Sequence, residues 1–338
     1  MPDQNNGPSG FLLMSKPPGI TSFDVVRQLR RLLGIKRLGH SGVLDKPAQG
    51  LLVVGVNKAT RLFELFASFT KEYEADFWFG LRTNTDDLSG ELLAQREPGE
   101  LTADVLEAAL ARYRGVISQV PPQFSLAKVG GKEMYRHALA GAELRPNARE
   151  VTVSASRLLE FAPAVPWAVA LSDYPSASRL SGLPESATLA RARVWVECKG
   201  GVYIRALARD IGVELGCGGS MGRLLRTRIG PFRLRDAVML EELEARLAGG
   251  VPVEHLLLPI SAVAAELHSV TLSTEQAVEL RHGRSLATTR LQEINPELSN
   301  GTNVICCLAE SGALIAIAQE LPAEHIGLRV LKPLKVFL

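Results

Sequence analysis

Two segments far apart in the chain alternate apolar and polar residues, and this alternation limits the possible folds more than any other feature. The first runs from residue 72 to 81 and the second from 190 to 198. Side chains of a strand point to opposite faces in turn, so each segment is predicted to be a strand with one buried face. A sheet that contains both strands needs other elements to cover that face.

Helical periodicity predicts the covering elements. Thr21, with Asp24 three residues later, forms a capping-box pattern, and apolar residues then recur at helical spacing until Gly34. A second amphipathic helix is predicted from Ile204 to Leu215. Shorter helices are predicted at 103–113, 241–247 and 273–281, and apolar strands at 11–14, 51–56, 304–308 and 313–318. This mixture of strands and helices indicates an α+β fold.

The length and local composition divide the chain. Its 338 residues exceed the size that one core usually serves, which favours two domains. Residues 1–10 are polar and rich in Gly, Pro and Asn, and we expect a disordered tail there. Residues 162–189 are rich in Pro, Ser and Ala without a clear period and are interpreted as a loop insertion. Pro259–Leu267 is interpreted as a linker that precedes a small β-rich module.

Composition and charge describe an ordinary globular protein. The chain is 46% hydrophobic and 22% charged with a net charge of +2. It has neither a signal-peptide pattern nor the ~20 consecutive apolar residues that span a bilayer. Its four cysteines show no metal-binding spacing, so we expect reduced thiols, no metal site and a cytoplasmic location. Basic residues gather at 22–40 and 199–235, which are either solvated faces or, if they meet in space, a phosphate-binding groove.

One carboxylate, Asp45, lies in a glycine-rich loop between the first basic helix and an apolar strand. The run Gly39–Asp45 reads GHSGVLD, and Gly50 follows shortly after it. No His/Cys cluster and no second carboxylate lie near Asp45 in the sequence. Asp45 is therefore either an ordinary turn residue or a carboxylate that acts alone as a covalent nucleophile, and the spacing leaves both interpretations open.

This loop resembles the catalytic loop of the TruB family, the tRNA pseudouridine-55 synthases, which reads roughly G-H-[ST]-G-x-L-D-P-x-A-[TS]-G. Two positions depart from it: Lys46 replaces the usual proline and Gln49 a small hydroxyl residue. Further stretches agree in order along the chain, and they are Lys71–Tyr73 with several positions of 80–90, Pro121–Ser125 with Lys128, Gly131 and Tyr135, and Lys199–Arg205. The resemblance covers most of residues 10–335.

The resemblance implies two domains and an activity. It implies a pseudouridine synthase catalytic domain at 11–262, with a mixed sheet and flanking helices, and a PUA-like RNA-binding domain at 268–338. The expected enzyme is a monomer that isomerises uridine 55 in the T stem-loop of tRNA. This reaction breaks an N-glycosidic bond and forms a C–C bond to the same base without a redox change, so no cofactor is expected.

The resemblance also assigns roles to site residues. Asp45 would be the nucleophile and Arg205 the two-point partner of a buried carboxylate, although Arg205 alone could equally bind phosphate. Tyr73 would stack on a flipped base, since RNA bases are typically read unstacked against aromatic rings. Tyr203 and Leu224 would lie close by, although core packing is the commoner role for all three. His40 would fill the space left by the flipped nucleotide, or else make a loop hydrogen bond.

Two rival functions stay open at this level. One is a non-catalytic RNA-binding or RNA-folding protein that keeps the basic groove. The other is a pseudouridine synthase for another stem-loop, because phosphate contacts position RNA without reading its sequence. The combination of Asp45, Tyr73 and Arg205 favours catalysis over binding alone.

Overall fold

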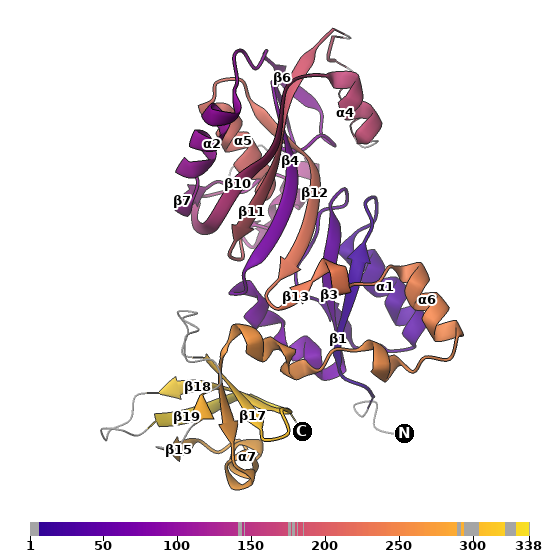
Figure 1. The fold of residues 1–338 in the computed structure, drawn as a ribbon, viewed down its shortest axis with the longest axis vertical. Helices are drawn as coiled ribbons and strands as arrows, with labels where there is room; N and C mark the ends of the chain where they lie inside the picture. The colour runs from indigo at the N-terminus through magenta and orange to yellow at the C-terminus, as the bar shows by residue number, and fades with distance from the viewer. Residues whose placement is uncertain are drawn as a thin grey trace.

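The computed structural model describes residues 7–140, 144, 146–174, 177, 180, 182–184, 186–288, 292–293, 304–321 and 329–337. Its largest element is a nine-stranded sheet (Figure 1). Seven strands follow one path, in the order β1 (Gly10–Lys16), β3 (Gln49–Val56), β12 (Gly219–Ile229), β4 (Lys71–Phe79), β11 (Thr188–Cys198), β10 (Arg149–Pro166) and β7 (Gly115–Gln119). The short strands β2 (Leu38–His40) and β13 (Phe232–Arg233) pair with β3 and β12. The β3–β12 pair is parallel and the others are antiparallel, so the sheet is mixed, as predicted.

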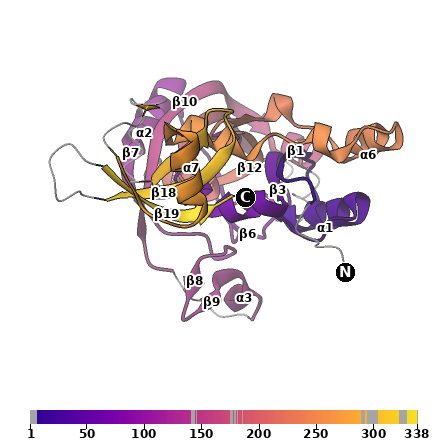
Figure 2. The same cartoon turned by 90° about the horizontal axis from the view of Figure 1, so that it is seen from below.

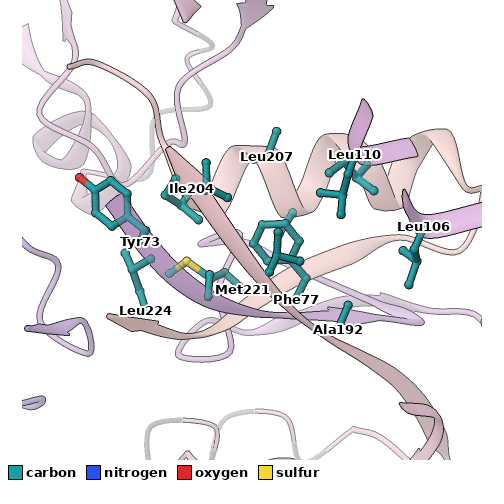
Figure 3. Packing of buried hydrophobic residues seen from close by; sticks show 14 of the residues in the cluster. Tyr73, Phe77, Leu106, Leu110, Ala192, Ile204, Leu207, Met221 and Leu224 are labelled. Carbon is teal, nitrogen blue, oxygen red and sulfur yellow. The ribbon is translucent and has the colours of Figure 1, made fainter. Parts of the chain in front are cut away.

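Helices bury the apolar faces of this sheet. α1 (Ser22–Leu33) and α6 (Leu240–Ala248) pack beside β1 and β3. α2 (Ala103–Arg112) and α5 (Ile204–Glu214) cover one face of β4, β10 and β11, as Figure 3 shows for part of the cluster. Ala75 and Phe77 of β4 and Val194 of β11 lie in this cluster, which confirms the predicted buried face. The opposite face of β4 is not exposed as predicted, because Asp76 and Trp78 are buried too.

Capping residues set the helix boundaries as the sequence predicts. Thr21 Oγ1 accepts a hydrogen bond from the Asp24 N–H at 3.1 Å, and the Asp24 carboxylate accepts one from the Thr21 N–H at 3.0 Å. α1 ends at Leu33 and is followed by the C-cap Gly34, whose φ of +66° suits glycine. Ser273 and Gln276 form the same box at the start of α7 (Thr274–Arg281).

The smaller elements of the first part of the chain lie around this sheet. They are β5 (Leu81–Thr83), β6 (Leu92–Gln95), β8 (Lys128–Val129), β9 (Lys132–Glu133), α3 (Met134–Leu139), α4 (Trp167–Asp173) and the 3-10 helices η1 (Asn57–Ala67), η3 (Leu234–Asp236), η4 (Val253–Leu256) and η5 (Ile260–Glu266). The β8–β9 hairpin and α3 project from the body of the molecule (Figure 2).

A second sheet forms the β-rich C-terminal part. Its order is β15 (Leu286–Thr288), β19 (Arg329–Val336), β18 (Leu314–Leu321), β17 (Val304–Ala309), β14 (His268–Leu272) and β16 (Gln292–Glu293). Cys306, Ile317 and Phe337 of this part share one hydrophobic cluster with Phe11 and Phe66 of the first part. The β-rich character is confirmed, while the division into domains at 11–262 and 268–338 stays a prediction.

The loop insertion expected at 162–189 is wrong for the described residues of that segment. β10 continues to Pro166, α4 occupies 167–173, and β11 begins at Thr188. Trp167, Leu180 and Leu183 are buried against Trp78 of β4. The frequent Pro and Ser residues of the segment obscured the few, widely spaced apolar residues that it buries.

The tail and the linker also differ from the prediction. Residues 1–6 of the expected tail lie outside the described residues, but Gly10 begins β1, and the Pro8 carbonyl accepts a hydrogen bond from Asn57 Nδ2 at 2.8 Å. The expected linker at 259–267 contains η5, and Val263 within it is fully buried. The described end of the tail and the expected linker therefore pack as parts of the fold.

Phe66 lies at the centre of an aromatic cluster. Its ring centroid lies between 4.9 and 5.8 Å from those of Phe11, Phe63, Phe69 and Phe232. We expect Phe66→Ala to lower the free energy of unfolding by about 3–5 kcal/mol, because the surrounding rings cannot close the cavity. Urea denaturation measures this loss. Phe23→Ala, at a residue that is 58% exposed, is the control, and an equal loss in both variants would contradict this packing.

Candidate active site

A cleft of about 610 Å³ opens where the loop after β2, the start of β4, β12 and the first turn of α5 converge. Five of the six residues singled out in the sequence line it, namely Asp45, Tyr73, Tyr203, Arg205 and Leu224. Lys46, Ser125 and Arg149 also line it. These residues come from six separate stretches of the chain, so the fold alone brings them together.

The loop that carries Asp45 is fixed on both sides. The Leu44 N–H donates a hydrogen bond of 2.9 Å to the hydroxyl of Ser22, the first residue of α1. The Ala48 N–H donates one of 3.0 Å to the Asp45 carbonyl, which closes a tight turn before β3. The backbone of Asp45 is therefore set by a helix start and a strand start.

Lys46 stands where the family pattern has proline, and the proline follows one position later as Pro47. The Lys46 carbonyl accepts hydrogen bonds from the Gly19 N–H at 2.8 Å and from Lys16 Nζ at 3.4 Å. Burial lowers the pKa of Lys16 to about 8, although Asp45 acts to raise it. The two hydrogen bonds hold the turn against the end of β1 and the residues that follow it, without a proline at position 46.

Arg226 of β12 supports the same loop from within the protein. Its Nε donates to the Leu51 carbonyl at 2.9 Å and its Nη2 to the Gly42 carbonyl at 3.3 Å. Burial lowers the pKa of Arg226, opposed by the neighbouring Tyr73 hydroxyl. Gly50 must be glycine here, because its φ is +105° and a Cβ would lie 2.4 Å from the Arg226 carbonyl oxygen.

Arg205 holds Asp45 at two points. Its Nε lies 2.8 Å from Asp45 Oδ2, and its Nη2 lies 3.2 Å from Oδ1. The same guanidinium donates to the carbonyls of Thr85 at 2.8 Å and Phe124 at 3.0 Å. The side chain of Arg205 is 4% exposed and that of Asp45 is 37% exposed. The expectation of a buried carboxylate is therefore wrong: the arginine is buried in α5, and the carboxylate faces the cleft.

Three carboxylates keep the buried Arg205 charged. Burial acts to lower the pKa of Arg205, but Asp45, Asp87 and Asp86 raise it, and the net direction is upward. Asp87 Oδ2 lies 3.7 Å from Arg205 Nε. A guanidinium enclosed in this way is positioned as an internal partner of Asp45 rather than as a surface contact for phosphate.

Tyr73 and Leu224 form the apolar wall of the cleft. They lie on the neighbouring strands β4 and β12 and are 8% and 7% exposed. Figure 3 shows both, together with Ile204, at one end of the buried cluster. Burial raises the pKa of the Tyr73 hydroxyl, so it stays protonated at neutral pH. Both residues belong to the core and also line the cleft, so core packing and pocket lining are compatible.

Tyr203 lies at the N-cap of α5 on the rim of the cleft. Its backbone is fixed by Gln119, which accepts from the Tyr203 N–H at 2.8 Å and donates to its carbonyl at 3.1 Å. The guanidinium of Arg149 lies over the Tyr203 ring, 5.0 Å from its centroid, and also donates to the Gly201 carbonyl. This stack places a cation and an aromatic ring together beside the cleft.

His40 is the one candidate that does not line the cleft. It ends β2, and its Nδ1 accepts a hydrogen bond of 3.3 Å from the Gly42 N–H. Burial lowers the pKa of His40, as does the nearby Arg226, so the neutral ring that can accept this bond is favoured. The loop hydrogen bond considered in the sequence is present.

Arginines of the second basic segment, residues 199–235, form ion pairs within the protein. It supplies α5 and also β12, a central strand that the sequence analysis missed because glycines and arginines interrupt its alternation. Arg209 pairs with Asp86 at 2.8 Å, and Arg228 pairs with Glu72 at 2.9 Å. β12 pairs with β3, and β3 pairs on with β2 at the end of the first basic segment, but Arg209 and Arg228 are held by acidic residues of the protein.

The described part of the chain has neither a metal-binding cluster of side chains nor a membrane-spanning helix. No group of three or more His, Cys, Asp or Glu side chains there could hold a metal ion. No helix of that part is long and apolar enough to cross a membrane. The four cysteines are buried free thiols.

Comparison with known proteins identifies the family. Residues 30–173 match the TruB family pseudouridylate synthase N-terminal domain, and residues 205–278 match the tRNA pseudouridylate synthase B C-terminal domain. The tRNA pseudouridine synthase B of Thermobifida fusca is 38% identical over 312 residues, which are 92% of this chain and 94% of that protein. That of Moorella thermoacetica is 37% identical over 327 residues, 97% of this chain and 98% of that protein.

Solved structures agree on the fold. An H/ACA RNP bound to a substrate RNA containing 2′-deoxyuridine includes a chain with a TM-score of 0.68 and 21% identity, and the match covers 97% of this chain and 85% of that one. A Cbf5-Nop10-Gar1 complex gives a TM-score of 0.69 at 22% identity, with the same coverage. Sequence identities of 21–22% support a shared fold only. The two relatives at 37–38% identity match over nearly the whole sequence and therefore show the family. The chain belongs to the TruB family of pseudouridylate synthases.

Proposed function

We propose that this enzyme isomerises uridine 55 in the T-loop of tRNA to pseudouridine, with Asp45 as the nucleophile and with flipping of the target base. The pair of Asp45 and Arg205 carries the proposal. It presents an accessible carboxylate to a cleft while a buried guanidinium holds both of its oxygens. The printed names of the relatives, tRNA pseudouridine synthase B, support tRNA as the substrate.

The chemistry needs little more than a positioned carboxylate. The bond between ribose C1′ and uracil N1 breaks, a bond between C1′ and C5 of the same base forms, C5 loses a proton and N1 gains one. A carboxylate with a reference pKa of ~3.9 is ionised at neutral pH and needs no activating base. Asp45 can attack the ribose carbon or the base, and either route divides one difficult step into easier ones.

Arg205 would act by alignment. Its contacts with the Thr85 and Phe124 carbonyls fix the guanidinium before substrate arrives, so the carboxylate of Asp45 has one preferred orientation. Such fixed geometry lowers the barrier because the reacting groups need not be ordered during the reaction. No cofactor is part of this proposal.

Access to the base requires an unstacked nucleotide, because the reacting atoms of a stacked uridine are covered by neighbouring bases. Tyr73 and Leu224 offer an apolar wall for the extruded ring, and Tyr203 lies on the rim. His40, outside the cleft, would instead fill the space that the nucleotide vacates. All of these groups come from one chain, which favours a monomer as the active unit.

Two stem-loop RNAs separate this proposal from its rivals. The T-arm and the anticodon arm of the same tRNA would be incubated with the full-length protein, and pseudouridine would be measured in each. We expect conversion of the T-arm alone. Conversion of the anticodon arm alone would indicate another target, and binding of both arms and of whole tRNA without conversion would indicate a non-catalytic RNA-binding protein.

RNA binding should depend steeply on salt concentration, and a substitution at Lys46 tests whether this side chain contacts an RNA phosphate. Lys46 is exposed and lines the cleft beside Asp45. We expect Lys46→Gln to reduce the magnitude of the slope of log affinity against log salt by about 0.7–0.9, the contribution of one phosphate contact. The control is Arg246→Gln, on α6 and paired with Glu242. Equal slopes in wild type and Lys46→Gln would remove Lys46 from the RNA interface.

Turnover should also survive removal of metal ions. The motive is the donor set of the site, which is a single carboxylate paired with an arginine. Activity on a minimal stem-loop, whose folding does not need magnesium, is expected to be unchanged in excess EDTA. Activity that vanished in EDTA and returned with zinc would contradict the mechanism.

A further inference from the structure

Ser125 carries a buried hydroxyl that no described residue satisfies. The residue is 5% exposed, and its Oγ has no hydrogen-bond partner among the described residues. Four buried side-chain atoms of the described chain share this condition, namely Arg30 Nε, Ser41 Oγ, Trp78 Nε1 and Ser125 Oγ. Of the four residues, Ser125 is the one that lines the cleft. Buried polar groups are normally hydrogen-bonded, so an unpaired hydroxyl in the lining of a cleft points to a hydrogen-bond partner on the ligand.

The backbone holds this hydroxyl in a fixed place. The preceding carbonyl, that of Phe124, accepts a hydrogen bond from Arg205 Nη2 at 3.0 Å, and the Ser125 carbonyl accepts one from the Tyr135 N–H at 3.1 Å. The same Nη2 donates to Asp45 Oδ1. Ser125 is therefore one residue away from the guanidinium that positions Asp45, and it is fixed before substrate binds.

The surroundings decide which ligand group suits Ser125. A phosphate at Ser125 would bring its negative charge close to the Asp45 carboxylate, whereas the stacked guanidinium of Arg149 offers a cationic site for phosphate on the cleft lining. A serine hydroxyl is neutral and can both donate and accept. Its partner next to the nucleophile is thus a neutral polar group of the nucleoside.

We propose that the Ser125 hydroxyl hydrogen-bonds to the target nucleoside, at a carbonyl of uracil or at the 2′-hydroxyl of its ribose, and so positions the nucleoside against Asp45. This inference rests on the proposed function and adds a substrate contact to it. Ser125 is a substrate-binding residue in this account, and Asp45 remains the nucleophile.

Ser125→Ala in the full-length protein tests the contact, with Ser172→Ala as the matched control. Ser172 lies on the exposed side of α4, where its hydroxyl bonds to the Val169 carbonyl. At saturating enzyme, Ser125→Ala should lower the single-turnover rate on the T-arm by roughly 5- to 100-fold, as expected when a buried partner is left unpaired. Its melting temperature should be unchanged, because the hydroxyl has no partner in the described free protein. Ser172→Ala should match wild type in rate.

Substrate analogues identify the partner. The T-arm would carry 2-thiouridine, 4-thiouridine or 2′-deoxyuridine at the target. One of these should slow the wild type by about the factor that Ser125→Ala shows on uridine, and Ser125→Ala should be insensitive to that change, which is the coupling expected for a direct contact. Coupling to a thiouridine assigns a uracil carbonyl, and coupling to 2′-deoxyuridine assigns the ribose.

Three results would overturn the inference: a Ser125→Ala rate within about twofold of wild type, a slower rate that merely follows lost thermal stability, or no coupling to any analogue. A wild-type protein that converts no uridine in any RNA would instead overturn the proposed function.

Discussion

Asp45→Asn should abolish pseudouridine formation while tRNA still binds. An amide cannot replace the carboxylate as a nucleophile, so we expect a fall of roughly 10⁴–10⁶-fold in the single-turnover rate, the size of loss seen when a covalent nucleophile is removed. tRNA affinity should stay within about tenfold, or ~1.4 kcal/mol, because a carboxylate adds nothing to phosphate binding. Quench-flow assays, with pseudouridine separated from uridine by chromatography after digestion to nucleosides, give the rate, and a filter-binding titration gives the affinity.

The fold should survive this substitution. In the variant, Arg205 would still donate hydrogen bonds to the Thr85 and Phe124 carbonyls and would still lie 3.7 Å from Asp87. The guanidinium therefore does not become an isolated buried charge. Thermal unfolding checks that the variant is native, and intact-mass analysis excludes deamidation back to Asp. Substantial conversion by a verified, folded Asp45→Asn protein would remove Asp45 from the role of nucleophile.

Arg205→Lys should be the second most damaging change. Lysine keeps the positive charge, but it cannot hold both oxygens of Asp45 and two backbone carbonyls at once. We expect turnover to fall by about 10²-fold or more, because a displacement of about 1 Å at a reacting group has an effect of this size. The single-turnover rate at saturating enzyme isolates this effect from RNA binding.

Arg235→Lys is the control for charge and residue type. The Arg235 side chain is 79% exposed and lies 3.9 Å from Asp236, away from the cleft lining. Its turnover should match wild type. Comparable losses in the two variants would mean that the two-point geometry at Asp45 does not matter for the reaction.

Local signals in the sequence were sufficient for elements whose faces differ. The alternation at 72–81 and the capping box at Thr21 gave β4 and α1, because burial of one face and satisfaction of free N–H groups act over a few residues. β12 was missed because it is central, carries Arg226 inward and is interrupted by Gly222. Its pairing with β4 and β3, which no local pattern encodes, keeps it in the sheet.

The candidate site also has features that the sequence indicates and features that only the fold determines. The loop motif indicated Asp45, and the family resemblance indicated Arg205, but the sequence could not show which of the two is buried. That depends on α5 packing against the sheet and on carbonyls at Thr85 and Phe124, about 80 to 120 residues away in the chain. The supports from Lys16 and Arg226 are equally non-local, since each reaches the loop from a different strand.

Mapping pseudouridine at nucleotide resolution in an unmodified full-length tRNA transcript tests the central claim most directly. The transcript would be incubated in parallel with wild type and with Asp45→Asn. The account predicts a single new pseudouridine at position 55 of the T-loop with wild type and none with the variant. Pseudouridine at another position, its absence with folded wild type, or equal formation by both proteins would contradict it.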